Sequence, residues 1–334
     1  MRSGGIKIIM LGHKKILEGL QKTMETNSVS HAYIFEGPDG IGRRETALSF
    51  ASMLLCEKGL GHCCQCQSCR LFAEGSNPDF QEIYLKDKSI AVDEIRNILK
   101  GLVIKPLYSG YKVIIINNAD SMTVQAQNAL LKSLEEPPRY VVFILTVQSS
   151  ASVTQTVRSR CRRILFNKLS DEEILCILTE KYGDRRPEWD FIISYADGVV
   201  GTALELAQSP EYLDTRNEIM HSVNQLLVSD KGDVFKTYEL FEKNSDKIEF
   251  ILKIMLLFFR DIIIYNQTLN YNILINSDKK DMIIENANLK LSCLLKCVAA
   301  VWSAKRGLEY NANFQLAIEV MLMKIKDSYV YKNS

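Results

Sequence analysis

Residues 31–46, HAYIFEGPDGIGRRET, decide the fold of this 334-residue chain. The apolar run Ala32 to Phe35 predicts a buried strand, a loop with Gly37, Gly40 and Gly42 follows it, and the residues beyond predict a helix. Glycines at such a place let backbone N–H groups face a phosphate, and the N-terminus of the next helix adds its dipole. The stretch therefore predicts a phosphate-binding loop between a strand and a helix.

Two residues depart from the pattern of that loop. Gly37 and Gly42 have the spacing of the motif G-x-x-x-x-G-K-[ST], but Arg43 stands at the lysine position and Arg44 at the Ser/Thr position. The hydroxyl group that would hold Mg²⁺ is therefore missing. The loop is either a fortuitous turn or a nucleotide site that has kept its shape and lost its chemistry.

A second stretch, KVIIINNAD at residues 112–120, favours the altered nucleotide site. Val113 to Ile116 read as a buried strand, and Asn117 and Asn118 follow at its carboxyl end, where ligands bind in open α/β sheets. A hydrolysing P-loop ATPase has an Asp for the metal there and often a Glu for the attacking water. Amides coordinate metal weakly and cannot act as a base. We therefore expect no intrinsic ATPase activity, and at most weak ATP binding through the glycine backbone and Arg43.

A cluster of cysteines follows the first helix after the loop. Cys56, Cys63, Cys66 and Cys69 form the spacing C-x6-C-x2-C-x2-C, which suits a closed, structural zinc site. Cys64 is a possible substitute for Cys63. The alternative, a group of free thiols, would be prone to oxidation in a polar loop.

Four other cysteines stand among apolar neighbours, and we expect them to pack in the core. They are Cys161, Cys176, Cys293 and Cys297.

Composition and charge exclude several classes of protein. The chain is 47% hydrophobic and 24% charged, as ordinary globular proteins are, and its net charge of +1 gives no overall attraction to nucleic acid. The apolar run Ile6 to Leu11 is short and interrupted by Lys7, so it does not resemble a signal peptide. Four charged residues within Ile248 to Tyr265 argue against a membrane span. We therefore expect a cytoplasmic protein with reduced cysteines.

Up to residue 167, strands alternate with helices, which predicts a parallel α/β sheet. The expected strands are 32–35, 81–85, 113–116, 140–146 and 164–166. The expected helices are 11–26, 44–55, 92–102 and 124–134. Glu135 and Glu136 precede two prolines that stop the last of these helices, so we give this carboxylate pair a structural role at a helix end.

From Leu169 onward the sequence predicts only helices. Ser170 and Glu173 form a capping box at the start of the first. Further helices are expected at 188–196, at 201–208 and, as a set, within 212–331. The expected domains are an α/β domain at 1–167, a small helical domain at 168–209 and an all-helical domain at 210–334.

The order of these motifs resembles a known family. HAYIFEGPDGIGR, the four-cysteine insertion, KVIIINNAD, NALLKSLEEPP, VRSRC and, near the end, NANFQLAIEVMLMKI resemble the bacterial clamp-loader subunits of DNA polymerase III, AAA+ relatives of the gamma/tau and delta-prime type. The resemblance covers nearly the whole chain. Active ATPase subunits of the family keep the lysine and the acidic pair, whereas the delta-prime type has a degenerate site, as this chain has.

The resemblance implies an architecture and partners. The α/β domain would be an AAA+ domain with a zinc module at about 56–72, followed by a helical lid and a helical collar for oligomerisation. The partners would be gamma/tau-type ATPase subunits and the delta subunit. Through the complex, the chain would act on a sliding clamp and primer-template DNA.

The resemblance also implies roles for two residues. Gly201 stands where the family has a sensor arginine, in the segment GVVGTAL at 198–204. Arg160, in Ser-Arg-Cys, corresponds to the arginine that reaches into the ATP site of a neighbouring subunit and acts there in trans.

Other interpretations remain open. The basic residues of 156–163 could form a DNA-facing patch. The chain could be a working gamma/tau-type ATPase that tolerates arginines in its loop. It could also be a stand-alone zinc-dependent DNA-binding protein, although its near-zero net charge argues against that.

Overall fold

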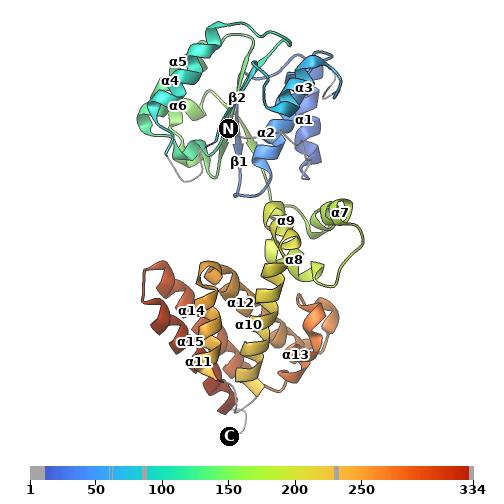
Figure 1. Ribbon diagram of the computed structural model, residues 1–334, viewed down its shortest axis with the longest axis vertical. Helices are drawn as coiled ribbons and strands as arrows, with labels where there is room; N and C mark the ends of the chain where they lie inside the picture. The colour runs from blue at the N-terminus through green and yellow to red at the C-terminus, as the bar shows by residue number, and fades with distance from the viewer. Residues whose placement is uncertain (1–11, 60, 62, 85–88, 229–232, 331–334) are drawn as a thin grey trace. The chain divides into compact units, whose positions relative to one another are not determined.

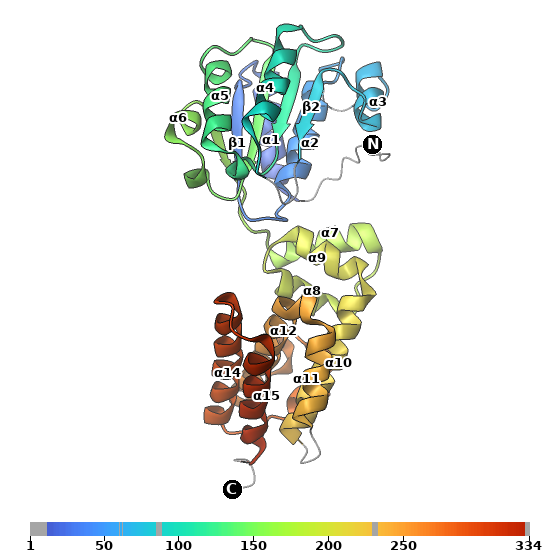
Figure 2. The same ribbon diagram turned by 60° about the vertical axis from the view of Figure 1, so that its left-hand side comes forward.

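The computed structural model describes residues 12–59, 61, 63–84, 89–228 and 233–330 (Figures 1 and 2). Leu11, Leu85 and Tyr331, where three expected elements begin or end, lie outside these residues, as does the run Ile6 to Leu11. The chain forms two compact units. One contains the residues up to Ile177 together with Gly198–Gly201, and the other contains Leu178–Asp197 and the residues from Thr202 onward.

The first unit is built on a parallel sheet of five strands in the order β2-β3-β4-β1-β5. The strands are β1 (Ala32–Glu36), β2 (Phe80–Ile83), β3 (Lys112–Ile116), β4 (Val141–Val147) and β5 (Arg162–Leu165). Among the described residues, the ends of each strand lie within two residues of the expected ends. Every residue of β1, β3 and β4 is buried, because these central strands are apolar on both faces. The parallel α/β prediction is confirmed.

Helices cover both faces of this sheet (Figures 1 and 2). On one face lie α1 (Lys14–Glu25), α2 (Arg43–Leu54) and α3 (Gln67–Glu74), and on the other α4 (Val92–Lys100), α5 (Val124–Glu135) and α6 (Gln155–Arg158). Alternate residues of β1 lie on opposite faces of the sheet. Tyr33 packs on the α2 side, whereas Ile34 packs on the α5 side.

Most helices of this unit agree with the sequence. The helix expected at 92–102 ends at Lys100 and continues as a 3₁₀ turn, Gly101–Val103. Two short helices were not expected: α3 lies within the cysteine-rich insertion, and α6 precedes Arg160. Neither is long enough to show a helical period in the sequence.

Helices alone follow β5 in the described residues. They are α7 (Asp171–Tyr182), α8 (Trp189–Ala196), α9 (Val200–Gln208), α10 (Pro210–Val228), α11 (Val234–Lys243), α12 (Ile248–Thr268), α13 (Lys280–Glu285), α14 (Leu291–Glu309) and α15 (Phe314–Val330). The expected capping box is present at α7, since the Ser170 N–H donates to Glu173 Oε2 (2.9 Å) and the Glu173 N–H donates to Ser170 Oγ (3.2 Å). No helix in the described ranges has both the length and the apolar character needed to cross a bilayer.

One of the four cysteines expected in the core is not there. Cys293 and Cys297 are buried and Cys161 is half-buried, but Cys176 is exposed. On α7 the buried positions are Ile174 and Leu178, one turn apart, and Cys176 lies on the opposite side of the helix. Its apolar neighbours in sequence therefore did not indicate its face.

Candidate functional site

The glycine loop between β1 and α2 has the backbone that its sequence predicts. Gly40 (φ 72°) and Gly42 (φ 104°) adopt left-handed conformations, which favour glycine. A Cβ at Gly37 would lie 2.8 Å from the carbonyl oxygen of Phe166, so the close approach of these two segments also requires glycine. No side chain caps the N-terminus of α2, whose N–H groups face the loop.

A pocket of about 410 Å³ opens at this loop, beside the carboxyl end of β3. It is lined by Asp39, Gly40, Gly42, Arg43, Arg44, Glu45, Tyr84, Asn117, Asn118 and Thr146. The structure thus brings together the expected residues of the loop and of the segment after β3. Gly37 is not among the lining residues.

Arg44 is bound to a carboxylate that the sequence did not single out. Its Nε and Nη2 atoms donate to Glu82 Oε1 (2.7 Å) and Oε2 (2.8 Å) on β2, and Asn117 Nδ2 donates to the same Oε1 atom (2.7 Å). Burial would lower the pKa of Arg44, but the hydrogen bonds and charge of Glu82 outweigh burial and raise it. Arg44, Glu82 and Asn117 therefore form one closed network of charge-assisted hydrogen bonds.

Arg43 is also paired within the chain. It is 5% exposed and forms an ion pair with Asp39, which also accepts a hydrogen bond from Gln148 Nε2 (2.6 Å). Burial lowers the pKa of Arg43 even though Asp39 and Asp120 act in the opposite direction. Its guanidinium is therefore not held as an unpaired positive charge at the loop.

The second asparagine after β3 is held by its backbone. Asn118 adopts a left-handed conformation (φ 49°), and its N–H donates to Thr146 Oγ1 (3.0 Å). Asn117 is 2% exposed and its side chain is engaged with Glu82. Neither residue brings an anionic group into the pocket.

Gly201 contacts the loop directly. Its N–H donates to the carbonyl oxygen of Gly40 (2.8 Å). A Cβ at position 201 would lie 2.7 Å from that oxygen and 3.0 Å from the Cα of Gly40. The position that the resemblance assigns to a sensor arginine therefore has no room for a side chain.

His13, which the sequence did not single out, also supports the glycine loop. His13 is 8% exposed, its Nε2 lies 2.7 Å from the carbonyl oxygen of Ile41, and its ring packs edge-on against Phe166. Burial lowers the pKa of His13. The neutral ring can donate from Nε2 to this carbonyl, and the loop is then fixed from the α1 side.

The four expected zinc ligands lie together. The Sγ atoms of Cys56, Cys63, Cys66 and Cys69 all lie within 4.8 Å of one another, and those of Cys63 and Cys69 are 3.9 Å apart. Tetrahedral Zn–S bonds of about 2.3 Å give sulfur separations of about 3.8 Å. Cys64 is exposed, has a left-handed backbone (φ 58°) and is not one of the four grouped cysteines, so Cys63 is the member of the cluster. The donor set fits zinc.

Backbone N–H groups donate hydrogen bonds to two sulfur atoms of this cluster. The Cys66 N–H lies 3.4 Å from Cys63 Sγ, and the Cys69 N–H lies 3.3 Å from Cys66 Sγ. Hydrogen bonds from the N–H groups of Gln65 and Cys66 lower the pKa of Cys63 to about 6, whereas burial raises the pKa of Cys56 and Cys69. A bound cation would offset the cost of ionising the buried thiols.

Arg160 lies just beyond α6 and is tied to its own chain. Its Nη2 forms an ion pair with Glu135 Oε1 (2.7 Å) at the end of α5. Its Nη1 donates to the carbonyl oxygen of Thr156 (2.8 Å). The Arg160 side chain is 34% exposed and that of Glu135 is 50% exposed. The expected finger residue is therefore at the surface, with a carboxylate beside it.

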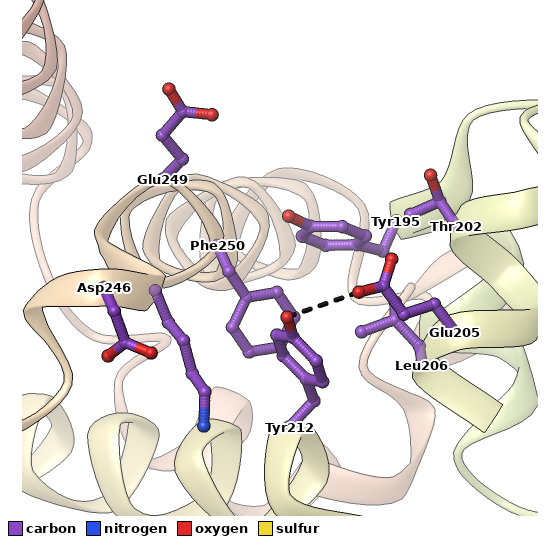
Figure 3. A pocket seen from close by; sticks show the side chains of 9 residues that line it. Tyr195, Thr202, Glu205, Leu206, Tyr212, Asp246, Glu249 and Phe250 are labelled. Carbon is purple, nitrogen blue, oxygen red and sulfur yellow. Dashed lines mark hydrogen bonds between the residues drawn. The ribbon is translucent and has the colours of Figure 1, made fainter. Parts of the chain in front are cut away.

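A second pocket, of about 250 Å³, lies among helices of the second unit (Figure 3). Tyr195, Tyr212 and Phe250 form its aromatic wall, and Tyr212 OH donates to Glu205 Oε1 (3.5 Å). Two lysines of the chain already lie over the tyrosine rings, Lys253 at 4.0 Å and Lys247 at 5.2 Å from the ring centres. We interpret this pocket as a gap between packed helices.

Comparison with known proteins gives family matches over most of the chain. Residues 12–170 match the family model described as DNA polymerase III, delta subunit, and residues 210–327 match the model of its C-terminal part. DNA polymerase III subunit delta′ of Bacillus subtilis is 28% identical, and the match covers 94% of this chain and 96% of that protein. This chain belongs to the clamp-loader subunits of DNA polymerase III, and within them to the delta-prime type.

Two other relatives are also similar to this chain. DNA polymerase III subunit delta′ of Pseudomonas aeruginosa is 39% identical over a match that covers 40% of this chain and 42% of that protein. DNA polymerase III subunit gamma of Buchnera aphidicola is 28% identical, and the match covers 94% of this chain and 93% of that protein. The chain is thus also similar to gamma-type subunits.

Proposed function

We propose that this chain is a non-hydrolysing AAA+ subunit of the DNA polymerase III clamp loader. It scaffolds the loader with gamma/tau-type ATPase subunits and a delta subunit, and it supplies Arg160 to a neighbour's ATP site. The complex would load a sliding clamp on primer-template DNA in the cytoplasm. The three domains expected from the sequence, with bounds 1–167, 168–209 and 210–334, would be the AAA+ domain, the lid and the collar.

The network of Arg44, Glu82 and Asn117 is the observation that carries the non-hydrolysing part of this proposal. In a hydrolysing site, a hydroxyl at position 44 and a carboxylate at position 117 would bind Mg²⁺. Here a guanidinium and an amide stand at those positions, and both bind the Glu82 carboxylate. A metal would have to displace a bidentate ion pair, and the amides of Asn117 and Asn118 would offer it no anionic ligand in exchange.

The charges around the pocket also oppose nucleotide binding. Each guanidinium that could attract phosphate is neutralised by a carboxylate of the chain, Arg43 by Asp39 and Arg44 by Glu82. Glu45 also lines the pocket. The N-terminus of α2 then remains as the attractive group, and its partial charge is small beside that of a nucleotide triphosphate.

The cysteine cluster would serve structure within this function. One zinc ion would be bound by Cys56, Cys63, Cys66 and Cys69. Four thiolates complete its tetrahedral coordination and leave no open position for catalysis. The ion would cross-link the end of α2 to α3. Its role is to fold the insertion.

The position of Arg160 supports the trans role. The guanidinium is partly exposed on a short helix end, and its ion pair is of the weak, solvent-exposed kind. An arginine in such a place can exchange a carboxylate for a neighbour's phosphate, which carries more charge and matches its planar fork.

ATP turnover by the isolated chain tests the non-hydrolysing claim. We expect turnover at background with Mg²⁺ present. Mg²⁺-dependent turnover that survives Asn118→Ala and disappears with Arg43→Ala would instead favour a gamma/tau-type ATPase. That alternative has the support of the gamma-type relatives.

A further inference from the structure

The ion pair between Arg160 and Glu135 bears on when the Arg160 guanidinium is available to a nucleotide of a neighbouring subunit. Glu135 is the last residue of α5, and Arg160 follows α6, which packs against α5 in the first unit (Figure 2). The two helices meet through Leu130, Leu134 and Val157, which are all buried in one apolar cluster. This packing places the end of α5 beside the residues that follow α6.

Both terminal nitrogens of Arg160 are engaged within its own chain. Nη2 lies 2.7 Å from Glu135 Oε1, and Nη1 donates to the carbonyl oxygen of Thr156 (2.8 Å), with Ser159 Oγ at 3.4 Å. The forked end that a phosphate would bind is therefore occupied. A phosphate that approaches this end must compete with Glu135.

The charge of the carboxylate decides the direction of its effect. A trans-acting arginine works by adding positive charge where negative charge develops on the reacting phosphoryl group. A carboxylate in contact with the guanidinium cancels much of that charge. Glu135 therefore cannot assist while it is paired, and it must release Arg160 before the neighbour's ATP is hydrolysed.

We infer that Glu135 is the resting counter-ion of Arg160, a restraint that holds the guanidinium within the subunit until a neighbour's nucleotide displaces it. This inference rests on the proposed trans role of Arg160. The pair is half-exposed, so the restraint is small, and removing it changes the availability of Arg160 by up to about fivefold.

The chain contains a matched control for this carboxylate. Glu136 is adjacent, exposed and of the same charge, and no ion pair of Glu136 is found among the described residues. Glu136→Gln removes the same unit of charge from the same helix end and leaves the Arg160 contact intact. Any effect of bulk charge would appear equally in both variants.

The experiment measures kcat and KM for ATP in the loader assembled with its gamma/tau-type and delta subunits. We expect Glu135→Gln to raise kcat/KM two- to fivefold at low salt and Glu136→Gln to leave it unchanged. The gain should shrink as salt is raised, because salt already weakens the pair in the unaltered chain. Glu135→Asp, which keeps the charge, should stay close to the unaltered chain.

Epistasis separates this inference from the proposed function. Glu135→Gln combined with Arg160→Ala should behave as Arg160→Ala alone, because the effect passes through Arg160. An unchanged or lowered rate for Glu135→Gln, or a gain that persists without Arg160, would overturn the restraint. If Arg160→Ala alone has no effect on the assembled loader, the trans role itself is wrong.

Discussion

Arg44 and Glu82 form a bidentate ion pair, with hydrogen bonds of 2.7 and 2.8 Å, between the start of α2 and β2. Asn117 completes the pair by donating to Glu82. In the proposed function, these side chains close the position of the metal.

The first prediction follows from that pair. Combining Arg43→Lys, Arg44→Thr, Asn117→Asp and Asn118→Glu should create Mg²⁺-dependent nucleotide binding, because it frees Glu82 and supplies a hydroxyl and carboxylates. A titration with a fluorescent nucleotide, with Mg²⁺ and with chelator, measures the effect. Turnover should stay low, since Gly201 leaves the sensor position without a cation.

Arg43→Lys alone is the control for the first prediction. It restores the motif lysine but keeps the pair of Arg44 and Glu82, so magnesium should still fail to promote binding. Tight, Mg²⁺-dependent binding by the unaltered chain or by this single variant would show that the pair does not close the site.

The second prediction concerns Gly201. Gly201→Ala should destabilise the first unit by about 1–3 kcal/mol, because its Cβ would meet the Gly40 carbonyl at 2.7 Å. Hydrogen exchange of the amides in β1 and α2 measures this change. The same clash means that an arginine at position 201 could not simply restore the sensor.

Gly19→Ala is the matched control, since Gly19 lies within α1 and a Cβ there meets nothing within 4 Å. It should leave stability unchanged or raise it by up to about 1 kcal/mol. Equal effects of the two substitutions would contradict a close contact at Gly201.

Much of this site was predictable from the sequence. The glycines of the loop, Asn117 and the cysteine cluster were recognisable because each motif is local, with fixed short spacings. Their partners were not. Glu82 lies 38 residues from Arg44 in the sequence, and its own segment carries no signal for an ion pair. The contact of Gly201 with Gly40 likewise depends on the fold, and the sequence showed only that the arginine was missing.

The cysteines show the same limit. Spacing predicted the cluster but left Cys63 and Cys64 as alternatives. The structure groups Cys63 with the other three cysteines, whereas Cys64 has a left-handed backbone and lies outside the group. Cys176 was wrongly expected in the core, because a residue's apolar neighbours do not show which side of a helix it occupies.

The third prediction is that the purified protein carries about one zinc ion per chain. Cys66→Ser or Cys69→Ser should lose the metal and loosen residues 56–72 while the sheet remains folded. Metal analysis after dialysis measures the ion, and Cys64→Ser should retain it. A stoichiometry near zero in the unaltered chain, or equal loss in all three variants, would contradict the assignment.

The fourth prediction concerns Asp79, a buried carboxylate in the turn before β2. It is 2% exposed and accepts hydrogen bonds from the N–H groups of Leu107 (2.8 Å) and Tyr108 (3.0 Å). Asp79→Asn should destabilise the first unit by about 2–3 kcal/mol, because buried N–H groups lose a charged acceptor.

Hydrogen exchange in β2 and β3 measures the effect of Asp79→Asn. The control is Asp93→Asn at an exposed site on α4, where the Asp93 side chain is 82% exposed and we expect a change of about 0.5 kcal/mol or less. Similar losses in the two variants would contradict the role of Asp79 as a buried acceptor.

The trans role of Arg160 is the central claim, and the ATPase of the assembled loader, stimulated by clamp and primed DNA, tests it most directly. Arg160→Ala should leave the fold, zinc content and assembly intact and lower this ATPase, because the guanidinium stabilises charge that develops in the transition state. Arg160→Lys should rescue poorly, since it lacks the planar fork. Arg158→Ala, which removes the same charge two residues away, should have little effect. Equal losses from the two alanine variants, both relieved at low salt, would contradict the account and indicate a diffuse DNA-binding patch.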